Sequence, residues 1–422
     1  MSAAEPSPSL DTAPEDWPYT AEGGAHIVFS YGGPSSPAYD GKVLRLRKPD
    51  CPPPSSDHQT LQNKWRYELL PRLLPRELLA ESREVIVEAG WFRELLILAD
   101  KVRPDSRKQG VVLADMVETS GNGLLMDDAT AVVKEGLESL AVEIKPKWGF
   151  LPSPTHMCPP ESVPIKSRIS RFTLHRHLKG HDDEKDYDPL DLFSGQEQRI
   201  ERALDALWTT WETSHGRGNN WRVFVSGNET HPDQSFRIPR TSAEGTLSAQ
   251  TSSFFIPVLL SSPALQQLKS LQSTLDPTDI SHIATLFHAA YPNAPLFDPE
   301  IITDITLAEL EQFLQLYLSD PAAGKDVEKW DLRQRMVAYT LSAIFKDCSI
   351  FVKAVLHKTP EETWELVQGR SSVKIIDLDV KPIKNMKRWA ETDEKIWKYW
   401  MSTKGARNEP VCVSISSSFS AT

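Results

Sequence analysis

Cysteine is scarce in this sequence, and no apolar run is long. The longest apolar run, residues 254–260, contains a proline, whereas a membrane helix needs about 18 apolar residues, so we expect no membrane partner. Residues 1–16 are acidic and rich in Pro and Ser, unlike a secretory signal. The cysteines form no CxxC pair, which predicts a reducing intracellular compartment without a disulfide framework; they are Cys51, Cys158, Cys348 and Cys412.

Positive charge is also in deficit. The chain has 47 Lys and Arg against 58 Asp and Glu, a formal charge of −11. Proteins that bind nucleic acid or anionic membranes generally carry a global excess of Lys and Arg, so both classes of partner are disfavoured. A small polyanion needs only a local cluster of cations and is not excluded. Hydrophobic residues make up 40%, which excludes a chain that is disordered or fibrous throughout.

The 422 residues are enough for two or three domains or for one two-lobed body. Strand patterns at 26–31, 42–47 and 140–148 mix with helical spacing in the first third. Further strands are predicted at 221–227 and 373–380, and the Pro- and Ser-rich stretch 226–253 interrupts the rest. Helical patterns dominate the remainder, at 168–178, 197–211, 263–271, 280–290, 307–318, 331–351 and 387–400.

These patterns predict an α+β fold in two lobes. We expect a strand-rich N-lobe over residues 17–141 and a larger mixed α/β C-lobe over 142–403. Residues 1–16 are expected to be a disordered lead, and residues 404–422 a flexible tail.

A glycine pair precedes the first strand pattern. Gly23 and Gly24 follow Glu22, and the next strand carries Arg45. Glycines between strands let backbone N–H groups approach phosphates, and a cation on the neighbouring strand can grip them. A plain hairpin turn is the alternative.

The segment 142–147 alternates apolar and charged residues. In an extended strand Glu143, Lys145 and Lys147 share one face while Val142 and Ile144 pack behind it. Two ammonium groups on one face repel each other unless an anion lies between them. The segment therefore indicates an anion site or, alternatively, a solvated strand face.

A helical pattern at 168–178 aligns three basic side chains. Arg171, His175 and Lys179 are four residues apart and lie on one stripe. Phosphate is the natural partner of such a stripe, because Arg grips it bidentately and Lys binds it as a point charge. An exposed basic helix is the alternative. His175 and His177 make a poor metal pair, because they face different sides of the helix.

Carboxylates occur at two further places in apolar surroundings. Asp347 follows an apolar helical pattern, and Asp377 and Asp379 end a predicted strand. Carboxylates at the end of a buried strand commonly hold Mg²⁺, which prefers oxygen ligands and bridges to substrate phosphates. Solvent-facing acids at a strand edge are the alternative.

Six segments occur along the chain in a recognisable order: EIKPKWGF (143–150), SRFTLHRHLK (170–179), YDPLDLFSG (187–195), NNWRVFVSG (219–227), KDCSI (346–350) and IDLDVKP (376–382). Together they resemble the inositol-pentakisphosphate 2-kinase family, and the similarity fits a divergent, fungal-type member. AEGGAHIVFSY (21–31) also matches the phosphate loop of that family. The resemblance spans residues 17 to 400, and EIKPK with YDPLDLFSG is a specific combination.

The resemblance implies a two-lobed inositol-phosphate kinase fold with ATP and Mg²⁺ as cofactors. It implies that Asp347 is the general base, that Lys145 and Lys147 span the transferred and inositol phosphates, and that Asp377, with Asp379 as the less favoured choice, holds Mg²⁺. The implied ATP contacts are Gly23, Gly24, Ala25, His26, Arg45, Asp127, Asp128, Glu143, Arg222 and Asp377. The implied inositide contacts are Arg107, Lys147, Arg171, His175, Lys179, Asn219, Asn220, Lys381, Asn385 and Trp389.

The sequence departs from the family at a few positions. Asn385 and Trp389 stand where the family commonly has an arginine and a tyrosine, and Lys384, Lys387 and Arg388 lie beside them. Asp127 and Ala129 replace an asparagine and a histidine that are frequent at the hinge. Residues 290–346 contain no cysteine or histidine, so we expect no zinc site of the kind found in plant members.

The implied activity is ATP-dependent phosphorylation of the 2-hydroxyl of inositol 1,3,4,5,6-pentakisphosphate, which gives the hexakisphosphate, phytate. The alternative is a non-catalytic sensor that binds inositol polyphosphates, but retention of Asp347, Asp377 and Lys145 disfavours it. An ordinary protein kinase is excluded because the chain lacks HRD and DFG. We expect a monomer, and nuclear or cytoplasmic residence.

Overall fold

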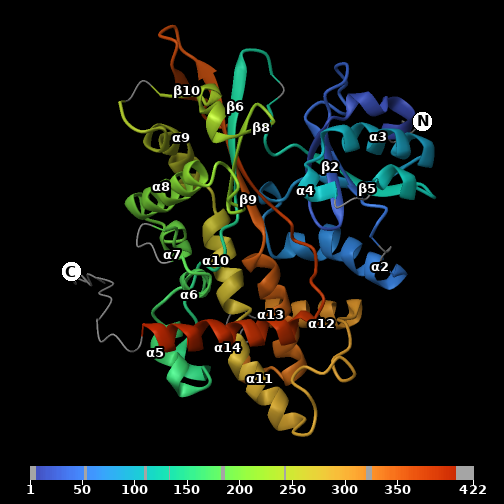
Figure 1. The fold of residues 1–422 in the computed structure, drawn as a ribbon. Helices are drawn as coiled ribbons and strands as arrows, with labels where there is room; N and C mark the ends of the chain where they lie inside the picture. Colours follow the sequence, from blue (N-terminus) through green and yellow to red (C-terminus); the bar gives the residue numbers. More distant parts are fainter. Residues whose placement is uncertain are drawn as a thin grey trace.

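The computed structural model describes residues 6–404 except 52–54, 109–111, 133, 182–185, 242–243 and 320–325. Two separate antiparallel sheets and many helices form the described chain. A smaller lobe holds the first sheet, and a larger, mostly helical lobe holds the second (Figure 1). This arrangement confirms the predicted α+β class.

The first sheet has the strand order β1-β2-β3-β5-β4. The strands predicted at 26–31 and 42–47 are present as β2 and β3. Helix α3 (Ala89–Val102) packs its apolar face, including Leu95 and Leu96, into the core of this lobe, and α4 (Asp105–Lys108) follows it. The strands are β1 (Tyr19–Glu22), β2 (His26–Ser30), β3 (Lys42–Arg47), β4 (Ser82–Val87) and β5 (Gly121–Asp127).

Residues 6–16 are ordered, contrary to the expected disordered lead. They form the short helix α1 (Pro8–Asp11) and a 3-10 turn, Pro14–Asp16. The Tyr39 hydroxyl donates to Asp11 Oδ2 at 2.6 Å, and Trp91 Nε1 donates to the Thr12 carbonyl at 3.0 Å. The two aromatic donors belong to the body of the smaller lobe, and their hydrogen bonds hold residues 11 and 12 against it. The composition of residues 1–16 alone does not reveal these interactions. Residues 1–5 lie outside the described residues, as does the predicted tail beyond Lys404.

The second sheet has the order β10-β9-β6-β7-β8, and β11 also pairs with β9. Strand β6 belongs to this sheet, so the expected lobe boundary at residue 141 falls inside a strand. Val142 and Ile144 face the main helical core, whereas Ala141 faces the opposite side with Phe224 and Phe351. The strands are β6 (Leu137–Ile144), β7 (Trp221–Val225), β8 (Asn228–Thr230), β9 (Ser349–Lys358), β10 (Trp364–Leu366) and β11 (Ser372–Ile376).

Helices of the larger lobe cover one face of the second sheet and extend below it (Figure 1). Helix α2 (Ser56–Lys64) and the π-helical turn Trp65–Leu69 also join this core, although the sequence places them in the N-lobe. The other helices are α5 (Val163–Lys166), α6 (Arg171–Leu178), α7 (Pro189–Leu192), α8 (Glu197–Thr213), α9 (Leu247–Ser261), α10 (Ala264–Thr274), α11 (Asp279–Ala290), α12 (Leu307–Ser319), α13 (Leu332–Lys346) and α14 (Asn385–Thr403).

Several predicted elements have different bounds in the structure. The strands predicted over 140–148 and 373–380 end at Ile144 and Ile376. The helix predicted over 331–351 ends at Lys346, and strand β9 begins at Ser349. The Pro- and Ser-rich stretch 226–253, expected to interrupt the regular elements, contributes β8 and the first half of α9. None of the helices in the described part of the chain is long and apolar enough to cross a membrane.

Candidate active site

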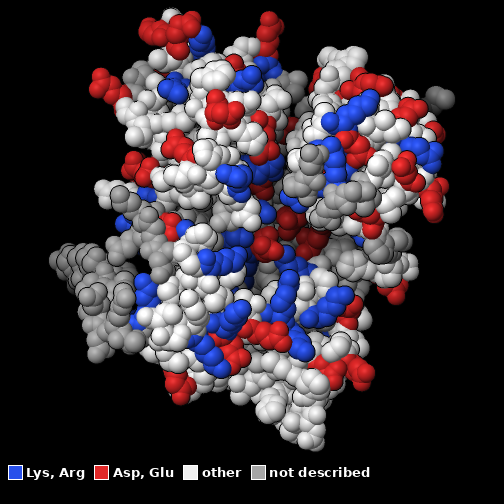
Figure 2. Space-filling model, viewed as in Figure 1, with Lys and Arg blue, Asp and Glu red and all other residues white. Residues whose placement is uncertain are grey.

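A cavity of about 930 Å³ opens in the larger lobe, between α6, the end of α13 and the start of α14. Lys and Arg side chains gather over α6 and α14 on the face shown in Figure 2. Nine of the ten side chains predicted to contact inositide line this cavity, and Asp347 lines it with them. The nine are Lys147, Arg171, His175, Lys179, Asn219, Asn220, Lys381, Asn385 and Trp389.

The backbone after β6 turns so that Lys147 enters the cavity. Strand β6 ends at Ile144, and Lys147 has a φ of 62°, so the strict alternation predicted for 143–147 stops at Ile144. The Tyr187 hydroxyl donates to the Pro146 carbonyl at 2.8 Å. A Cβ on Gly149 would lie 2.3 Å from the Phe193 ring, so this close packing requires glycine. The motif containing Tyr187 and Phe193 therefore positions the segment that carries the lysines.

Helix α6 begins with a side-chain cap and presents its predicted stripe to the cavity. Ser170 Oγ accepts from the Thr173 N–H, and Arg171, His175 and Lys179 all line the cavity. Burial, together with Lys179, Arg171 and Lys147, lowers the pKa of His175 to about 4. The stripe therefore carries two cations and a neutral imidazole at pH 7, rather than three cations.

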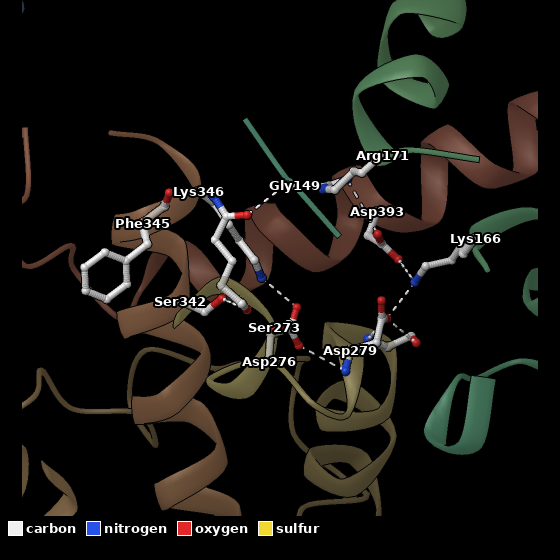
Figure 3. Close-up of polar contacts among 12 residues, drawn as sticks. Gly149, Lys166, Arg171, Ser273, Asp276, Asp279, Ser342, Phe345, Lys346 and Asp393 are labelled. Atoms are coloured by element: carbon white, nitrogen blue, oxygen red, sulfur yellow. Dashed lines mark hydrogen bonds and ion pairs between the residues drawn. The ribbon is translucent and has the colours of Figure 1, made fainter. Parts of the chain in front are cut away.

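Arg171 is held from behind by buried ionic groups. Its guanidinium lies over the Trp148 ring at 4.8 Å, and its Nη1 is 3.5 Å from Asp393 Oδ1. Asp393 also pairs with Lys166 at 2.6 Å, and Lys166 pairs with Asp279 at 2.6 Å (Figure 3). Within the described chain, Arg171 Nη1 is buried on the Asp393 side and makes no hydrogen bond, while the Arg171 side chain also lines the cavity.

Asp347 lies at the C-terminal end of α13, among lysines. Its Oδ2 accepts from Lys381 Nζ at 2.8 Å, and its Oδ1 is 3.7 Å from Lys147 Nζ. Burial opposes ionisation, but Lys381, Lys147 and Lys145 together lower the pKa of Asp347. Its carboxylate is thus ionised at neutral pH and available to accept a proton.

Some predicted contacts lie outside the cavity lining. Lys145 is half-buried, and its N–H donates to the Asn220 carbonyl at 3.1 Å. Its charge affects the pKa of both Lys147 and Asp347, so it lies near them. Arg107 is exposed on α4 in the smaller lobe. Their roles toward a ligand remain predictions.

The cavity also contains cations that the sequence interpretation did not select. Arg176, Lys346 and Arg388 line it. The spacing of Asn385, Arg388, Trp389 and Thr392 places these four residues on one face of α14, and all four line the cavity. A helical stripe starting at Asn385 is therefore the sequence signal that identifies Arg388.

The glycine pair lies in the turn between β1 and β2. The Gly23 N–H donates to the His26 carbonyl at 2.8 Å, which closes the turn. Neither glycine has a positive φ, and a side chain at either would meet open space. The fold itself therefore does not require glycine there, whereas close approach of a ligand would. Glu22 anchors the turn, because its buried carboxylate pairs with Lys48 at 2.6 Å and Arg103 at 3.0 Å.

Beside this turn lie the remaining predicted phosphate and metal groups. Arg45 Nη2 is 3.3 Å from His26 Nδ1, and burial lowers the pKa of His26 to about 3, so the ring is neutral. Arg45 is 3.7 Å from Asp377 and 3.4 Å from Asp379, and Arg66 holds the other Asp379 oxygen at 2.9 Å. Asp379 is thus engaged by two arginines.

Asp377 fits a magnesium ligand better than Asp379 does. It directly follows β11 with a φ of 65°, and its side chain is 56% exposed. The segment that follows Asp377 has no regular structure and is held by α2 and the π-helical turn. The Gln62 side-chain amide forms hydrogen bonds with both backbone groups of Val380. Trp65 Nε1 donates to the Leu378 carbonyl. Neither Gln62 nor Trp65 belongs to a sequence motif that marks it as part of a site.

The other predicted nucleotide contacts are largely engaged with protein groups. Glu143 and Arg222 are paired in register on β6 and β7 and form an ion pair at 3.0 Å. Asp128 Oδ1 accepts from the Thr130 N–H and hydroxyl, so it stabilises its own turn. Asp127 pairs with Lys42. Contacts of these residues, and of Ala25, with a nucleotide remain predictions.

A zinc site was not expected, and this stays a prediction. Across the described ranges, no group of three or more His, Cys, Asp or Glu side chains is arranged to hold a metal ion. A Mg²⁺ ion held by the single carboxylate of Asp377 would not require such a group.

Comparison with known proteins agrees with the motifs. The family model described as inositol-pentakisphosphate 2-kinase matches residues 19–395. An inositol-pentakisphosphate 2-kinase of Cryptococcus neoformans is 51% identical over 410 residues, covering 96% of this chain and 98% of that protein. The rice protein "Inositol-pentakisphosphate 2-kinase IPK1" is 28% identical over 447 residues, covering 94% of this chain and 96% of its own length. The chain therefore belongs to the inositol-pentakisphosphate 2-kinase family.

Proposed function

We propose that the chain transfers the γ-phosphoryl group of ATP to the 2-hydroxyl of inositol 1,3,4,5,6-pentakisphosphate. The observation that carries the proposal is the shared cavity: segments far apart in sequence bring Lys147, Arg171, Lys179 and Lys381 to one cavity that Asp347 also lines. Cations at close quarters are unfavourable without a counter-anion. A compact ring of phosphates supplies that anion, and the 51% identical relative carries this activity in its name.

Asp347 orients and deprotonates the accepting hydroxyl. Its lowered pKa keeps the carboxylate ionised, and its side chain is 60% exposed toward the cavity. Lys147 and Lys381, which contact it, neutralise the charge that develops on the phosphoryl oxygens. Positioning and electrostatic stabilisation supply most of the acceleration in phosphoryl transfer.

The nucleotide lies between the lobes in this proposal. Gly23 and Gly24 let the backbone approach the phosphates, and Arg45 grips them from β3. Asp377 would hold Mg²⁺, which would offset the negative charge of the phosphates. The open space at both glycines and the exposed Asp377 carboxylate support this arrangement.

The distribution of charge favours a small polyanion over a long one. The chain has a net charge of −11, while the cavity is lined by cations. An acidic exterior repels nucleic acid and anionic membranes, and a pocket of limited volume admits a six-membered ring. We infer a monomeric, intracellular enzyme, nuclear or cytoplasmic, with no nucleic-acid or membrane partner.

One incubation separates the kinase from a non-catalytic sensor. The protein is mixed with ATP, Mg²⁺ and the pentakisphosphate, and the products are separated by ion-exchange chromatography. The kinase produces the hexakisphosphate and ADP in equal amounts. Tight calorimetric binding of the pentakisphosphate without any hexakisphosphate would establish the sensor instead.

A further inference from the structure

A buried glutamine behind the cavity joins two segments of the active site. Gln272, near the end of α10, is completely buried and does not line the cavity. Its side-chain amide donates to the carbonyls of Lys147 at 2.9 Å and Phe345 at 2.8 Å. Its amide oxygen accepts from the Gly149 N–H at 2.7 Å. Both ends of the amide are therefore engaged by backbone groups near the reacting site.

The two segments carry the groups that the reaction needs close together. Lys147 has a φ of 62°, a conformation that a lysine rarely adopts, so its surroundings must hold it there. Phe345 lies two residues before Asp347, at the end of α13. Lys147 Nζ and Asp347 Oδ1 are 3.7 Å apart, and the Gln272 amide forms hydrogen bonds with both of the backbone segments that carry them.

A second interaction, from the segment that follows α10, restrains the end of α13. Asp276, four residues after Gln272, accepts from Lys346 Nζ at 2.6 Å. Lys346 points toward Asp276 in the buried interior (Figure 3), and its ammonium is 3.8 Å from the centre of the Trp148 ring. Asp347 follows Lys346 directly, so a fixed Lys346 leaves Asp347 little freedom to move.

We propose that Gln272 is a positioning residue for phosphoryl transfer, holding Lys147 and Asp347 at their working separation. The inference rests on the proposed function and assigns to it a residue that touches no substrate. A displacement of about 1 Å at a reacting centre costs about 10²-fold in rate. Loss of the amide therefore lowers kcat, while the KM for ATP stays unchanged because Arg45 and Asp377 pair with each other and Gln62 holds the segment of Asp377 through Val380.

The test compares Gln272→Met with Ser342→Ala. Methionine matches glutamine in length but forms none of the three hydrogen bonds. Ser342 is also completely buried, and its hydroxyl donates to the main-chain carbonyl of Gln272 at 2.7 Å. Ser342→Ala thus removes a buried hydrogen bond from the same corner without touching the side-chain amide. Both variants are checked by thermal melting and assayed for hexakisphosphate formation.

We expect Gln272→Met to lose about 10²-fold in kcat with an unchanged KM for ATP, and Ser342→Ala to keep the wild-type kcat. Equal kcat in both variants and wild type would overturn the inference. If Gln272→Met shows no cooperative melt, Gln272→Asn, which keeps an amide on a shorter side chain, replaces it in the assay. The same loss of kcat is then expected, and a wild-type kcat would overturn the inference. Failure of both to fold would make Gln272 a stability residue and also overturn it. Absence of hexakisphosphate from the wild type and Ser342→Ala would instead refute the proposed function.

Discussion

Replacing Asp347 with asparagine separates its chemistry from its structural contribution. The Asp347 side chain is 60% exposed, and its ion pair with Lys381 is 2.8 Å long. A pair this exposed contributes about 0–1 kcal/mol to stability, so the variant should melt close to the wild type. A general base contributes about 10²–10⁴-fold, and kcat should fall by that factor with the substrate saturating.

The same substitution should strengthen binding of the inositide. Asp347→Asn removes a negative charge from a site that takes a polyanion and leaves Lys147 and Lys381 without that partner. At a separation of about 6 Å and the dielectric constant of water, the repulsion between the Asp347 carboxylate and one phosphate charge is about 0.7 kcal/mol. Removing it should lower the Kd of the inositide by about threefold for each phosphate charge at that distance.

A discontinuous or continuous assay of ADP release gives kcat. Calorimetric titration with the pentakisphosphate, in the absence of ATP, gives its Kd. Lower kcat together with a lower Kd is the expected combination. A kcat near that of the wild type at saturation would refute the assignment of Asp347 as the base. Weaker inositide binding would refute its placement beside the phosphates.

Individual side-chain contacts at the metal, glycine and histidine positions determine how three further sets of variants should behave. Asp377→Asn should raise the Mg²⁺ concentration needed for half-maximal rate. Asp379→Asn should not, because Arg45 and Arg66 already hold the Asp379 carboxylate in the wild type. Equal magnesium titrations of the two variants would contradict the assignment of Asp377 as the ligand. Gly149→Ala should lower the free energy of unfolding by at least about 1–3 kcal/mol, because its Cβ meets the Phe193 ring at 2.3 Å, while Gly23→Ala should melt like the wild type and bind ATP more weakly. His175 is neutral in the folded protein, with a pKa of about 4, but unfolded histidine titrates near 6.5. Protonation below that pH thus favours the unfolded chain, and His175→Gln should become increasingly stabilising relative to wild type as pH falls from 7 to 5, with a constant difference in melting temperature contradicting the shift.

Much of the site was predictable because its residues occur in contiguous patterns. Helical periodicity alone identifies the stripe of Arg171, His175 and Lys179. An acidic residue at the end of a predicted strand identifies Asp377. Motif order then placed Asp347 with them. The charge of His175 was not predictable, because its lowered pKa arises from burial and from Lys147 on another element.

Groups that act through long-range contacts escaped prediction. Gln62, Gln272 and Asp276 sit in helical patterns like any polar residue, and only the fold shows that Gln62 holds Val380 and that Gln272 holds Lys147. Nothing local in their spacing distinguishes them from solvated side chains.

Two element boundaries were missed for a related reason. α13 is buried on nearly all sides and continues into the buried strand β9 without Gly or Pro between them, so hydrophobic periodicity cannot mark the change. α9 is apolar on most sides and contains Pro257, and it lacks the amphipathic stripe typical of surface helices.

The central claim is that this one cavity binds the pentakisphosphate. Calorimetric titration of wild type and Arg171→Met without ATP tests it directly, because Arg171 lines the cavity, while Lys166 still pairs with Asp393 in the variant. Loss of a charge-assisted hydrogen bond of about 1.5–3 kcal/mol should weaken binding by about 10- to 150-fold. An Arg171→Met protein that folds and binds the pentakisphosphate as tightly as the wild type would contradict the account.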